Sequence, residues 1–230
     1  MTQYWLEREE RLIGGENVEK LVSSRVVVFG IGGVGSYVAE AIARAGVGHI
    51  LLIDSDVVDL TNINRQLIAD RTTVGLYKTY VMRARIGKIN PECDVRVAEC
   101  FVGENNIDAI LDVFRPDYAA DCIDTVSSKL AVISACGERN IPVISSMGTG
   151  NKMDPSRFRI GDITETSVCP LARCMRHELK TRGIPHLDVL WSDETPRRSG
   201  ERSPASISFV PSSAGLLIAS HIIRRLIGDI

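Results

Sequence analysis

Three glycines and an aspartate in the first quarter of the chain have the spacing of a nucleotide-binding loop. Gly30, Gly32 and Gly35 satisfy the pattern G-x-G-x-x-G immediately after the apolar run at residues 26–29. In such a loop the first glycine permits a tight turn, the second lets the backbone approach a phosphate, and the third lets the next helix pack closely. The N-terminus of that helix attracts an anion. Asp54, at the end of the next apolar run, is placed to bind ribose hydroxyls.

The residues that follow Asp54 point to triphosphate chemistry rather than hydride transfer. A dehydrogenase needs one acid here and little more, whereas this chain adds the set Asp56, Asn62, Arg65 and Lys78. Cationic groups are needed when charge builds up on a pyrophosphate leaving group. Asp124 ends a later apolar run, at the edge of the sheet where ligands bind. A carboxylate facing a triphosphate is a natural magnesium ligand.

Ordinary structural roles for the same residues stay open. The glycines could serve only close packing in an α/β core. Arg65 and Lys78 could simply pair with nearby carboxylates. The candidates are Asp56 and Asp59, and surface pairs of this kind contribute little to stability. Asp124 could cap the helix that follows it, which is a common role for aspartate after a strand.

Alternating strands and helices are expected to position these residues. Apolar runs alternate with amphipathic segments as far as residue 146, which predicts a Rossmann-like, doubly wound, mostly parallel α/β sheet. We expect further, antiparallel strands in the C-terminal part. The expected strands are 26–29, 49–53, 94–98, 118–123, 142–146, 157–163, 187–191 and 206–210. The expected helices are one or two within 7–21, then 34–45, 76–89, 107–114, 128–139, 170–182 and 212–227.

Composition is that of an ordinary globular protein. The 230 residues are 44% hydrophobic with a net charge of −2, which argues against a broadly basic nucleic-acid binder. No repeat or clear linker is visible, so we expect residues 1–230 to form a single domain. No apolar run reaches about 18–20 residues and the N-terminus has no secretory pattern, so we expect no membrane span. The simplest compartment is the cytoplasm, with reduced thiols.

Several separate motifs together resemble those of the adenylating enzymes related to ubiquitin-activating enzymes, the group that contains ThiF, MoeB and HesA. The resemblance implies ATP-dependent adenylation of a carboxylate. The motifs cover the first ~125 residues and form a specific signal. They are Gly30-Ile-Gly-Gly-Val-Gly35, Asp54-Ser-Asp56, Thr61-Asn-Ile-Asn-Arg-Gln66, Gly75-Leu-Tyr-Lys78 and Cys122-Ile-Asp124.

This resemblance implies a role for each matching position. Asp54 would hold the ribose, Asn62 and Arg65 would contact the phosphates, and Lys78 would neutralise them. Asp124 would bind Mg²⁺. The whole nucleotide-binding set is then Gly30, Gly32, Gly33, Gly35, Asp54, Asp56, Asn62, Arg65, Lys78 and Asp124, and the catalytic set is Arg65, Lys78, Asp124 and Arg8.

Arg8 implies an oligomer. It lies in the N-terminal segment Leu-Glu-Arg-Glu-Glu-Arg-Leu-Ile-Gly and resembles an arginine that reaches the triphosphate of a partner subunit. That role would require a homodimer. The alternative is an ordinary solvated helix residue.

The later part of the chain is similar to one branch of this superfamily, the tRNA threonylcarbamoyladenosine dehydratases. ThiF and MoeB relatives usually carry two Cys-x-x-Cys zinc pairs, and this chain has none. The matching residues are Val102, Asp154-Pro155, Asp162-Ile-Thr164, Cys169-Pro-Leu-Ala172 and Ser213-Ala-Gly215. The branch implies adenylation of the threonyl carboxylate of a modified tRNA adenosine, followed by ring closure with net loss of water.

Two rival functions remain. One is adenylation of the C-terminus of a small ubiquitin-like sulfur-carrier protein for thiamine or molybdopterin biosynthesis. Cys169, before Pro170 at a predicted helix start, would then be the reactive thiol, and a sulfur-transfer protein could be a partner. The other is a redox-type Rossmann module, which would not need Arg65, Lys78 and Asp124 in this arrangement.

Basic residues in the C-terminal part are candidates for contacts with tRNA phosphates. Arg173, Arg176 and Lys180 recur at i, i+3 and i+7 of the helix predicted from Pro170. Three more arginines, Arg197, Arg198 and Arg202, fall in the polar segment 194–204, which we expect to be a mobile loop. A solvated helix face and a soluble loop are the alternative.

Overall fold

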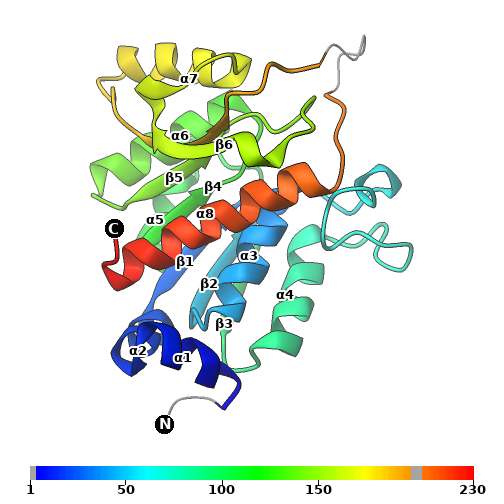
Figure 1. The fold of residues 1–230 in the computed structure, drawn as a ribbon, viewed down its shortest axis with the longest axis vertical. Coiled ribbons are helices and arrows are strands. Elements are labelled where there is room, and N and C mark those ends of the chain that lie inside the picture. Colours follow the sequence, from blue (N-terminus) through cyan, green and yellow to red (C-terminus); the bar gives the residue numbers. More distant parts are fainter. Residues whose placement is uncertain (1–3, 198–203) are drawn as a thin grey trace.

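One seven-stranded sheet organises the protein. The computed structural model describes residues 4–197 and 204–230. The strands lie in the order β3-β2-β1-β4-β5-β7-β6, and neighbours are parallel except for the antiparallel pair β6 and β7 (Figure 1). The predicted doubly wound, mostly parallel sheet is thus confirmed. The strands are β1 (Arg25–Phe29), β2 (His49–Ile53), β3 (Asp94–Ala98), β4 (Tyr118–Asp121), β5 (Val143–Ser146), β6 (Phe158–Asp162) and β7 (Asp188–Ser192).

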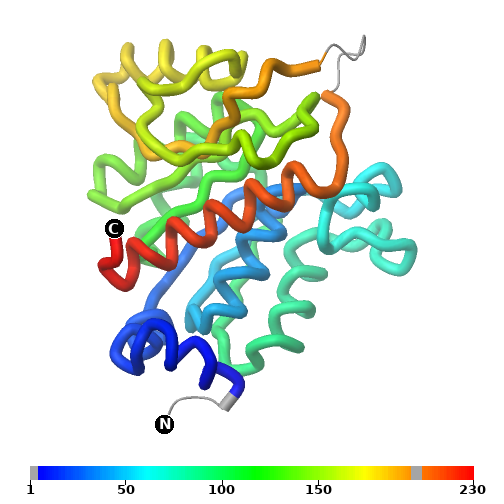
Figure 2. Tube along the Cα trace, viewed as in Figure 1, coloured from blue at the N-terminus to red at the C-terminus, as the bar shows by residue number. Residues whose placement is uncertain are grey.

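Helices cover both faces of this sheet. Helices α3, α4 and α8 lie on one face and α5 and α6 on the other, and the tube in Figure 2 follows the chain between them. The helices are α1 (Glu7–Ile13), α2 (Gly15–Ser23), α3 (Gly35–Arg44), α4 (Lys78–Ile89), α5 (Ile107–Phe114), α6 (Val126–Glu138), α7 (Pro170–Thr181) and α8 (Phe209–Ile227). Short 3₁₀ turns occur at Tyr4–Leu6, Leu60–Asn62, Pro155–Arg157 and Ile163–Glu165.

The interior strand β1 is apolar from Val26 to Phe29, and its packing shows why. Successive side chains of a strand point to opposite faces of the sheet. Val26 and Val28 accordingly belong to the core under α3 and α8, while Val27 and Phe29 belong to the core under α5 and α6. All four are fully buried. A strand covered on both faces has no polar side to show, so it reads as a continuous apolar run.

The strand order reverses at β1, between β2 and β4. From β1 the chain moves outward through β2 to β3, and then returns to β4 on the other side of β1. The connections therefore leave the carboxyl ends of β1 and β4 in opposite directions and open a crevice there. Ligands of doubly wound folds bind at this switch point.

One predicted strand, at residues 206–210, is wrong. The chain enters α8 at Phe209, and Pro211 falls in the first turn of that helix, where its missing N–H leaves no bond unmade. Val210 is a buried residue of this helix and not of a strand. Among the described residues β6 is therefore the one strand that runs antiparallel to the rest of the sheet. The apolar stretch before Pro211 was too short to separate the two possibilities.

Helix α8 packs along one face of the sheet. Ala214, Ile218 and Ile222 bury one side of it against the core. Its last turn carries Arg224 and Arg225. Neither α8 nor any other helix within residues 4–197 and 204–230 is long and apolar enough to cross a membrane.

Candidate nucleotide-binding and acyl-transfer site

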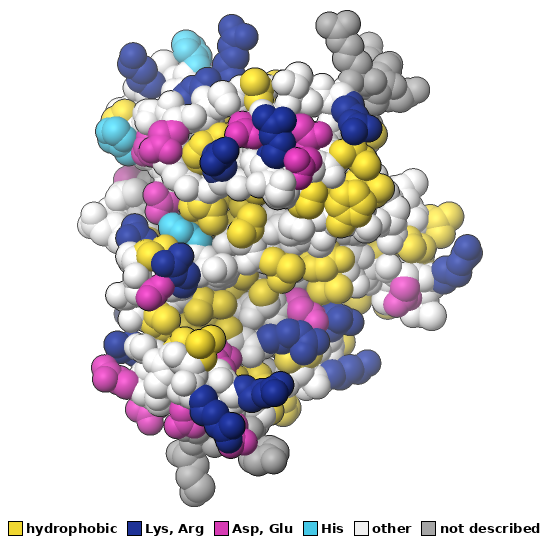
Figure 3. Space-filling model, in the orientation of Figure 1, with side chains coloured by type: hydrophobic (Ala, Val, Ile, Leu, Met, Phe, Trp, Pro, Cys, Tyr) yellow, Lys and Arg dark blue, Asp and Glu magenta, His cyan; other side chains and the backbone are white. Residues whose placement is uncertain are grey.

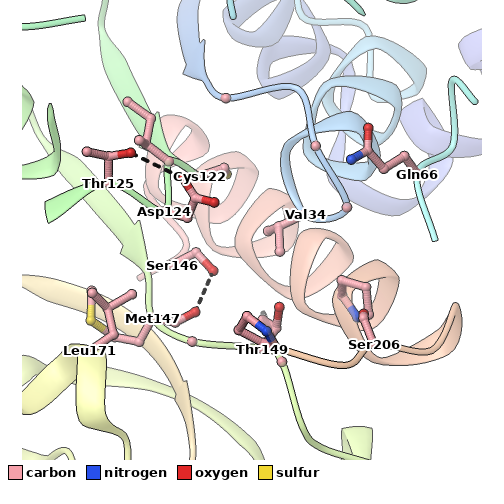
Figure 4. Close-up of a pocket in the computed structure, with 18 of the residues that line it drawn as sticks. Val34, Gln66, Cys122, Asp124, Thr125, Ser146, Met147, Thr149, Leu171 and Ser206 are labelled. Carbon is pink, nitrogen blue, oxygen red and sulfur yellow. Dashed lines mark hydrogen bonds between the residues drawn. The ribbon is translucent and has the colours of Figure 1, made fainter. Parts of the chain in front are cut away.

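A cavity of about 730 Å³ opens at the carboxyl ends of β1, β2, β4 and β5. It lies at the switch point of the sheet, and Figure 4 shows its walls. Gly35 and Arg8 are the two predicted site residues that do not line it. The predicted residues that do line it are Gly30, Gly32, Gly33, Asp54, Asp56, Asn62, Arg65, Lys78 and Asp124.

The glycines of the loop have different reasons to be glycine. A Cβ on Gly35 would lie 1.8 Å from the carbonyl oxygen of Gly30, so close packing inside the loop accounts for Gly35. A Cβ on Gly32 would meet no protein atom closer than 3.8 Å, the Nε2 of Gln66. Packing therefore does not require a glycine at position 32, and the room at its backbone faces the cavity. This arrangement suits the close approach of a phosphate.

Asp54 links the glycine loop to the end of β2. Its Oδ2 accepts a hydrogen bond from the backbone N–H of Ile31 at 2.6 Å, and its Oδ1 accepts one from Asp56 at 2.8 Å. Burial raises the pKa of Asp54, although the charge of Lys78, 4.0 Å away, acts in the opposite direction. The carboxylate thus stabilises the loop from the position expected for a ribose ligand.

This raised pKa predicts how nucleotide binding depends on pH. ATP affinity should begin to fall, by about tenfold or more, at a pH above the ordinary aspartate value of about 3.9, because the protonated carboxyl loses charge-assisted hydrogen bonds. The effect on folding has the opposite sign: the folded state binds this proton more readily than the unfolded state, so acidification through this window favours folding. Calorimetric titration with ATP at several pH values measures the affinity. Asp54→Asn should bind weakly and lack this pH dependence, and an unchanged dependence in that variant would contradict the assignment.

Lys78 forms an ion pair with Asp56, one of the two carboxylates that the sequence offered as partners. It is the first residue of α4, and its Nζ lies 2.7 Å from Oδ2 of Asp56. A bridge between Val57 and Tyr77 brings the two residues together. Lys78 is nevertheless almost fully buried beside the cavity, where a cation has a stronger electrostatic effect than at the surface. The ion pair and the predicted phosphate role are therefore compatible.

Arg65 does not pair with Asp59. Its Nη1 donates to the carbonyl of Thr61 and to Oδ1 of Asn64, both at 2.9 Å, and no described carboxylate lies within ion-pair distance. Asp59 instead caps the 3₁₀ turn reciprocally with Asn62, which is buried. The turn thus places Arg65 at the cavity, where no neighbouring acid neutralises the charge of its guanidinium group.

Asp124 projects into the cavity and does not cap α6. The residue at the N-cap of α6 is Thr125, not Asp124, and the Thr125 side chain makes no capping hydrogen bond. Asp124 is exposed, and its one side-chain hydrogen bond is a long one, 3.4 Å, from Thr125 Oγ1. In Figure 4 it projects from the end of β4 toward the same space as Ser146, opposite Val34 and Gln66. The helix-capping alternative is therefore wrong.

No protein cage for a metal surrounds Asp124. Within the described part of the chain no three His, Cys, Asp or Glu side chains converge in a way that could hold an ion. Mg²⁺ is commonly bound by one or two carboxylates together with substrate phosphates and water. A single free carboxylate facing the glycine loop fits that mode of binding.

A buried ion pair beneath Asp124 escaped the sequence analysis. Lys129 of α6 and Asp121 of β4 are completely buried, with Nζ 2.9 Å from Oδ2. Lys129 also donates to the carbonyls of Ile123 and Ser146, and Ser145 Oγ donates to Asp121. These bonds join the ends of β4 and β5 at the cavity. The one sequence signal was a lysine among the apolar residues of a predicted helix.

The second half of the cavity, beyond β5, is built around Asn151. Its backbone and side chain bond to Arg197 and Ala205, the residues close to either side of the undescribed residues 198–203. Neighbouring Lys152 is buried and donates to the carbonyl of Glu194 at 2.8 Å, and burial lowers the pKa of Lys152. Most of the predicted 194–204 loop lies outside the described residues, so its closure over the site stays a prediction.

Cys169 and Arg8 lie in contrasting places. Cys169 is buried, lines the cavity and precedes α7, as the sequence predicted. Arg8 is exposed on α1, at the end of the sheet where the strands begin, and so lies far from its own chain's cavity (Figure 1). Any contact of Arg8 with a nucleotide would have to be made in a second subunit.

Comparison with known proteins decides the family. The ThiF family profile matches residues 6–230, nearly the whole chain. The protein belongs to the ThiF family. Its sheet, glycine loop and cavity thus belong to a ThiF-type adenylating fold, as the sequence motifs predicted.

Within the ThiF family, this chain is strongly similar to members of one branch. The chain is 44% identical to the tRNA threonylcarbamoyladenosine dehydratase of Bacillus subtilis, over 97% of this chain and 94% of that protein. It superposes on the Escherichia coli tRNA N6-threonylcarbamoyladenosine dehydratase in complex with ATP with a TM-score of 0.92 at 35% identity, covering 99% of this chain and 97% of that one. The same enzyme has been solved in complex with AMP.

The carrier-protein branch of the ThiF family is more distant. The sulfur carrier protein ThiS adenylyltransferase of Escherichia coli is 32% identical, over 57% of this chain and 52% of that protein. The shared region is little more than half of each chain. The resemblance to the dehydratase branch, in contrast, extends through α8.

Proposed function

We propose that this protein is an ATP-dependent tRNA threonylcarbamoyladenosine dehydratase. The observation that carries the proposal is a free carboxylate, Asp124, facing a glycine loop across a cavity that Arg65 and Lys78 border. The named activity of the Bacillus subtilis and Escherichia coli relatives supports the substrate.

The residues fit an adenylation followed by ring closure. A carboxylate oxygen of the threonyl group attacks the α-phosphorus of ATP, and pyrophosphate leaves. Arg65 and Lys78 stabilise the charge that develops on the leaving phosphates. The carbamoyl group then attacks the activated acyl carbon, expels AMP and releases a proton. The net change in the nucleoside is loss of water, and because the second step is intramolecular, positioning supplies much of its rate.

Magnesium belongs to this proposal through Asp124. When bound, Mg²⁺ would neutralise phosphate charge. Asp124 would hold it, and Asp54 would hold the ribose. No thiol takes part, so neither a reactive Cys169 nor a sulfur-transfer protein is required. ATP and tRNA meet in the cytoplasm, where we expect the protein to act.

One incubation tests the reaction. The protein is mixed with ATP, magnesium and tRNA that carries threonylcarbamoyladenosine, and AMP release and nucleoside mass are measured. The proposal expects AMP and a nucleoside lighter by one water. AMP formation only when a small carrier ending in Gly-Gly is added would replace it with the carrier-protein function. No adenylating activity with either substrate would favour a nucleotide-binding module.

We also propose a homodimer as the working form. Hydrophobic side chains gather in a band across the face that carries α8 (Figure 3). Leu216 and Leu217 of α8 are exposed there, and contiguous apolar surface of this kind marks an interaction site. A two-fold dimer repeats each contact in both subunits, so each Arg8 would enter the partner's cavity.

Subunit mixing tests the role of Arg8. Arg8→Gln and Asp124→Asn should each be nearly inactive, but their mixture should recover about a quarter of wild-type activity. Random exchange makes half of the dimers mixed, and one of the two sites in each mixed dimer has both residues. AMP formation is measured after exchange, with native mass spectrometry to count mixed dimers. Full activity of Arg8→Gln alone, or no recovery despite mixed dimers, would contradict the role.

A further inference from the structure

We infer that one side of helix α7 binds the phosphate backbone of the RNA around the reacting nucleoside. The inference rests on the proposed function, because it takes tRNA to be the substrate. Pro170 and Leu171, at the start of α7, form part of the cavity wall. RNA that places one nucleoside in the cavity passes over the residues around its mouth, and α7 extends away from that mouth.

The sides of α7 are set by its buried residues. Ala172, Met175 and Leu179 are fully buried and pack in the core shared with α6 and β7. At about 100° per residue, Arg173, His177 and Lys180 form a separate stripe, at i, i+4 and i+7. All three are exposed. The stripe extends roughly 10 Å along the helix, since each residue adds about 1.5 Å.

The charge of this stripe is not neutralised by the protein. It contains no acidic residue, and no carboxylate of the described residues lies within ion-pair distance of Arg173 or Lys180. The opposite flank of α7 differs, because Glu178 pairs there with Arg182, the residue that follows the helix, at 3.0 Å. In Figure 3 basic and histidine side chains gather along the top edge, over α7. Unpaired cations are available to contact phosphates.

Arg176, which the sequence placed among the RNA contacts, has a different role. Its Nη1 donates to the carbonyl of Thr166 at 2.8 Å and to the hydroxyl of the same residue. The side chain therefore ties α7 to the segment that precedes it. His177 takes its place in the exposed stripe. Arg197 is also exposed, whereas Arg198 and Arg202 lie outside the described residues.

The opposite wall of the cavity suits RNA less well. The segment that carries Asn62 and Arg65 also carries the exposed acids Asp59 and Asp70. Hydrogen bonds from Thr61 and Thr72 lower the pKa values of Asp59 and Asp70, respectively, so both are ionised at neutral pH. The same segment carries Arg65 and Arg71, so its cations are balanced by acids, whereas the α7 stripe contains cations and no acid. The backbone is therefore expected on the α7 side.

Salt dependence of RNA binding tests the inference. The double variant Arg173→Gln, Lys180→Gln is compared with Lys20→Gln, Lys88→Gln, which removes the same charge from exposed positions on α2 and α4 near the starts of the strands. Binding of an unmodified anticodon stem-loop is measured over a range of salt concentrations. The slope of log K against log salt should fall in magnitude by about 0.7–0.9 for each phosphate that the protein no longer binds, and thus by about 1.4–1.8 in the α7 variant. The control should keep the wild-type slope.

Kinetics separate this inference from the reaction itself. With modified tRNA the α7 variant should show a raised KM for tRNA and an unchanged kcat, with an unchanged KM for ATP. A wild-type slope in the α7 variant, or an equal reduction in the control, would overturn the inference. If the wild-type protein binds RNA through α7 but makes no water-loss product, the inference stands and the proposed reaction fails. If the product forms with α7 neutralised at unchanged KM, the reaction stands and the inference fails.

Discussion

Asp124→Asn is expected to lower the rate of AMP formation by at least about 10²-fold, the scale of losing one preorganised electrostatic group at a reaction centre. The carboxylate is exposed in the cavity and makes one long hydrogen bond, to Thr125. Asparagine has nearly the same shape, so folding should be unaffected. The reduced rate therefore reports on charge facing the triphosphate. Single-turnover AMP formation and the thermal midpoint measure the two effects.

A matched control and a second readout sharpen this test. Asp112→Asn makes the same change on α5, where Asp112 is exposed and pairs with Arg139, and it should leave the rate unchanged. Magnesium should strengthen ATP binding to the wild-type protein but not to Asp124→Asn. Normal turnover by Asp124→Asn, or an equal response to magnesium, would remove Asp124 from the site.

Lys129→Met is expected to destabilise the protein by about 3–5 kcal/mol, because it leaves Asp121 buried without its partner charge. The thermal midpoint should fall by roughly 6–20 °C for a domain of this size. Lys129 also donates hydrogen bonds to the carbonyls of Ile123 and Ser146, so the edge of the cavity loses both of these bonds. Urea unfolding and calorimetry measure the decrease in stability.

Removing both charges distinguishes an uncompensated charge from a simple loss of packing. Asp121→Asn, Lys129→Met leaves no unpaired ion, so it should regain much of the stability that Lys129→Met alone removes. If Lys129→Met does not fold, the double variant still tests the role of the unpaired charge, because the double variant itself is expected to fold. Equal stability of wild type and Lys129→Met would show that the pair contributes little.

Sequence patterns predicted the regular elements well, for reasons seen in particular strands. β2 and β3 begin and end where predicted, at His49–Ile53 and Asp94–Ala98, and the carboxyl end of β4 at residue 121 is two residues short of the prediction. Buried parallel strands are continuous apolar runs bounded by polar residues, so their limits are visible in one dimension. The stretch 206–210 failed because its few apolar residues fit a strand or a helix equally well.

The chain by itself determined the fold class, the nucleotide loop and the acids at the strand ends, because each depends on residues close in sequence. Only the tertiary structure decided what each polar side chain does. Lys78 pairs with Asp56 yet lines the cavity, Asp124 is free of the helix it precedes, and Arg176 is tied to Thr166. The physical reason is that hydrogen bonds and burial depend on residues that folding brings together. Asp121 and Lys129 show it most clearly, since nothing in their spacing predicts that both would be completely shielded from water.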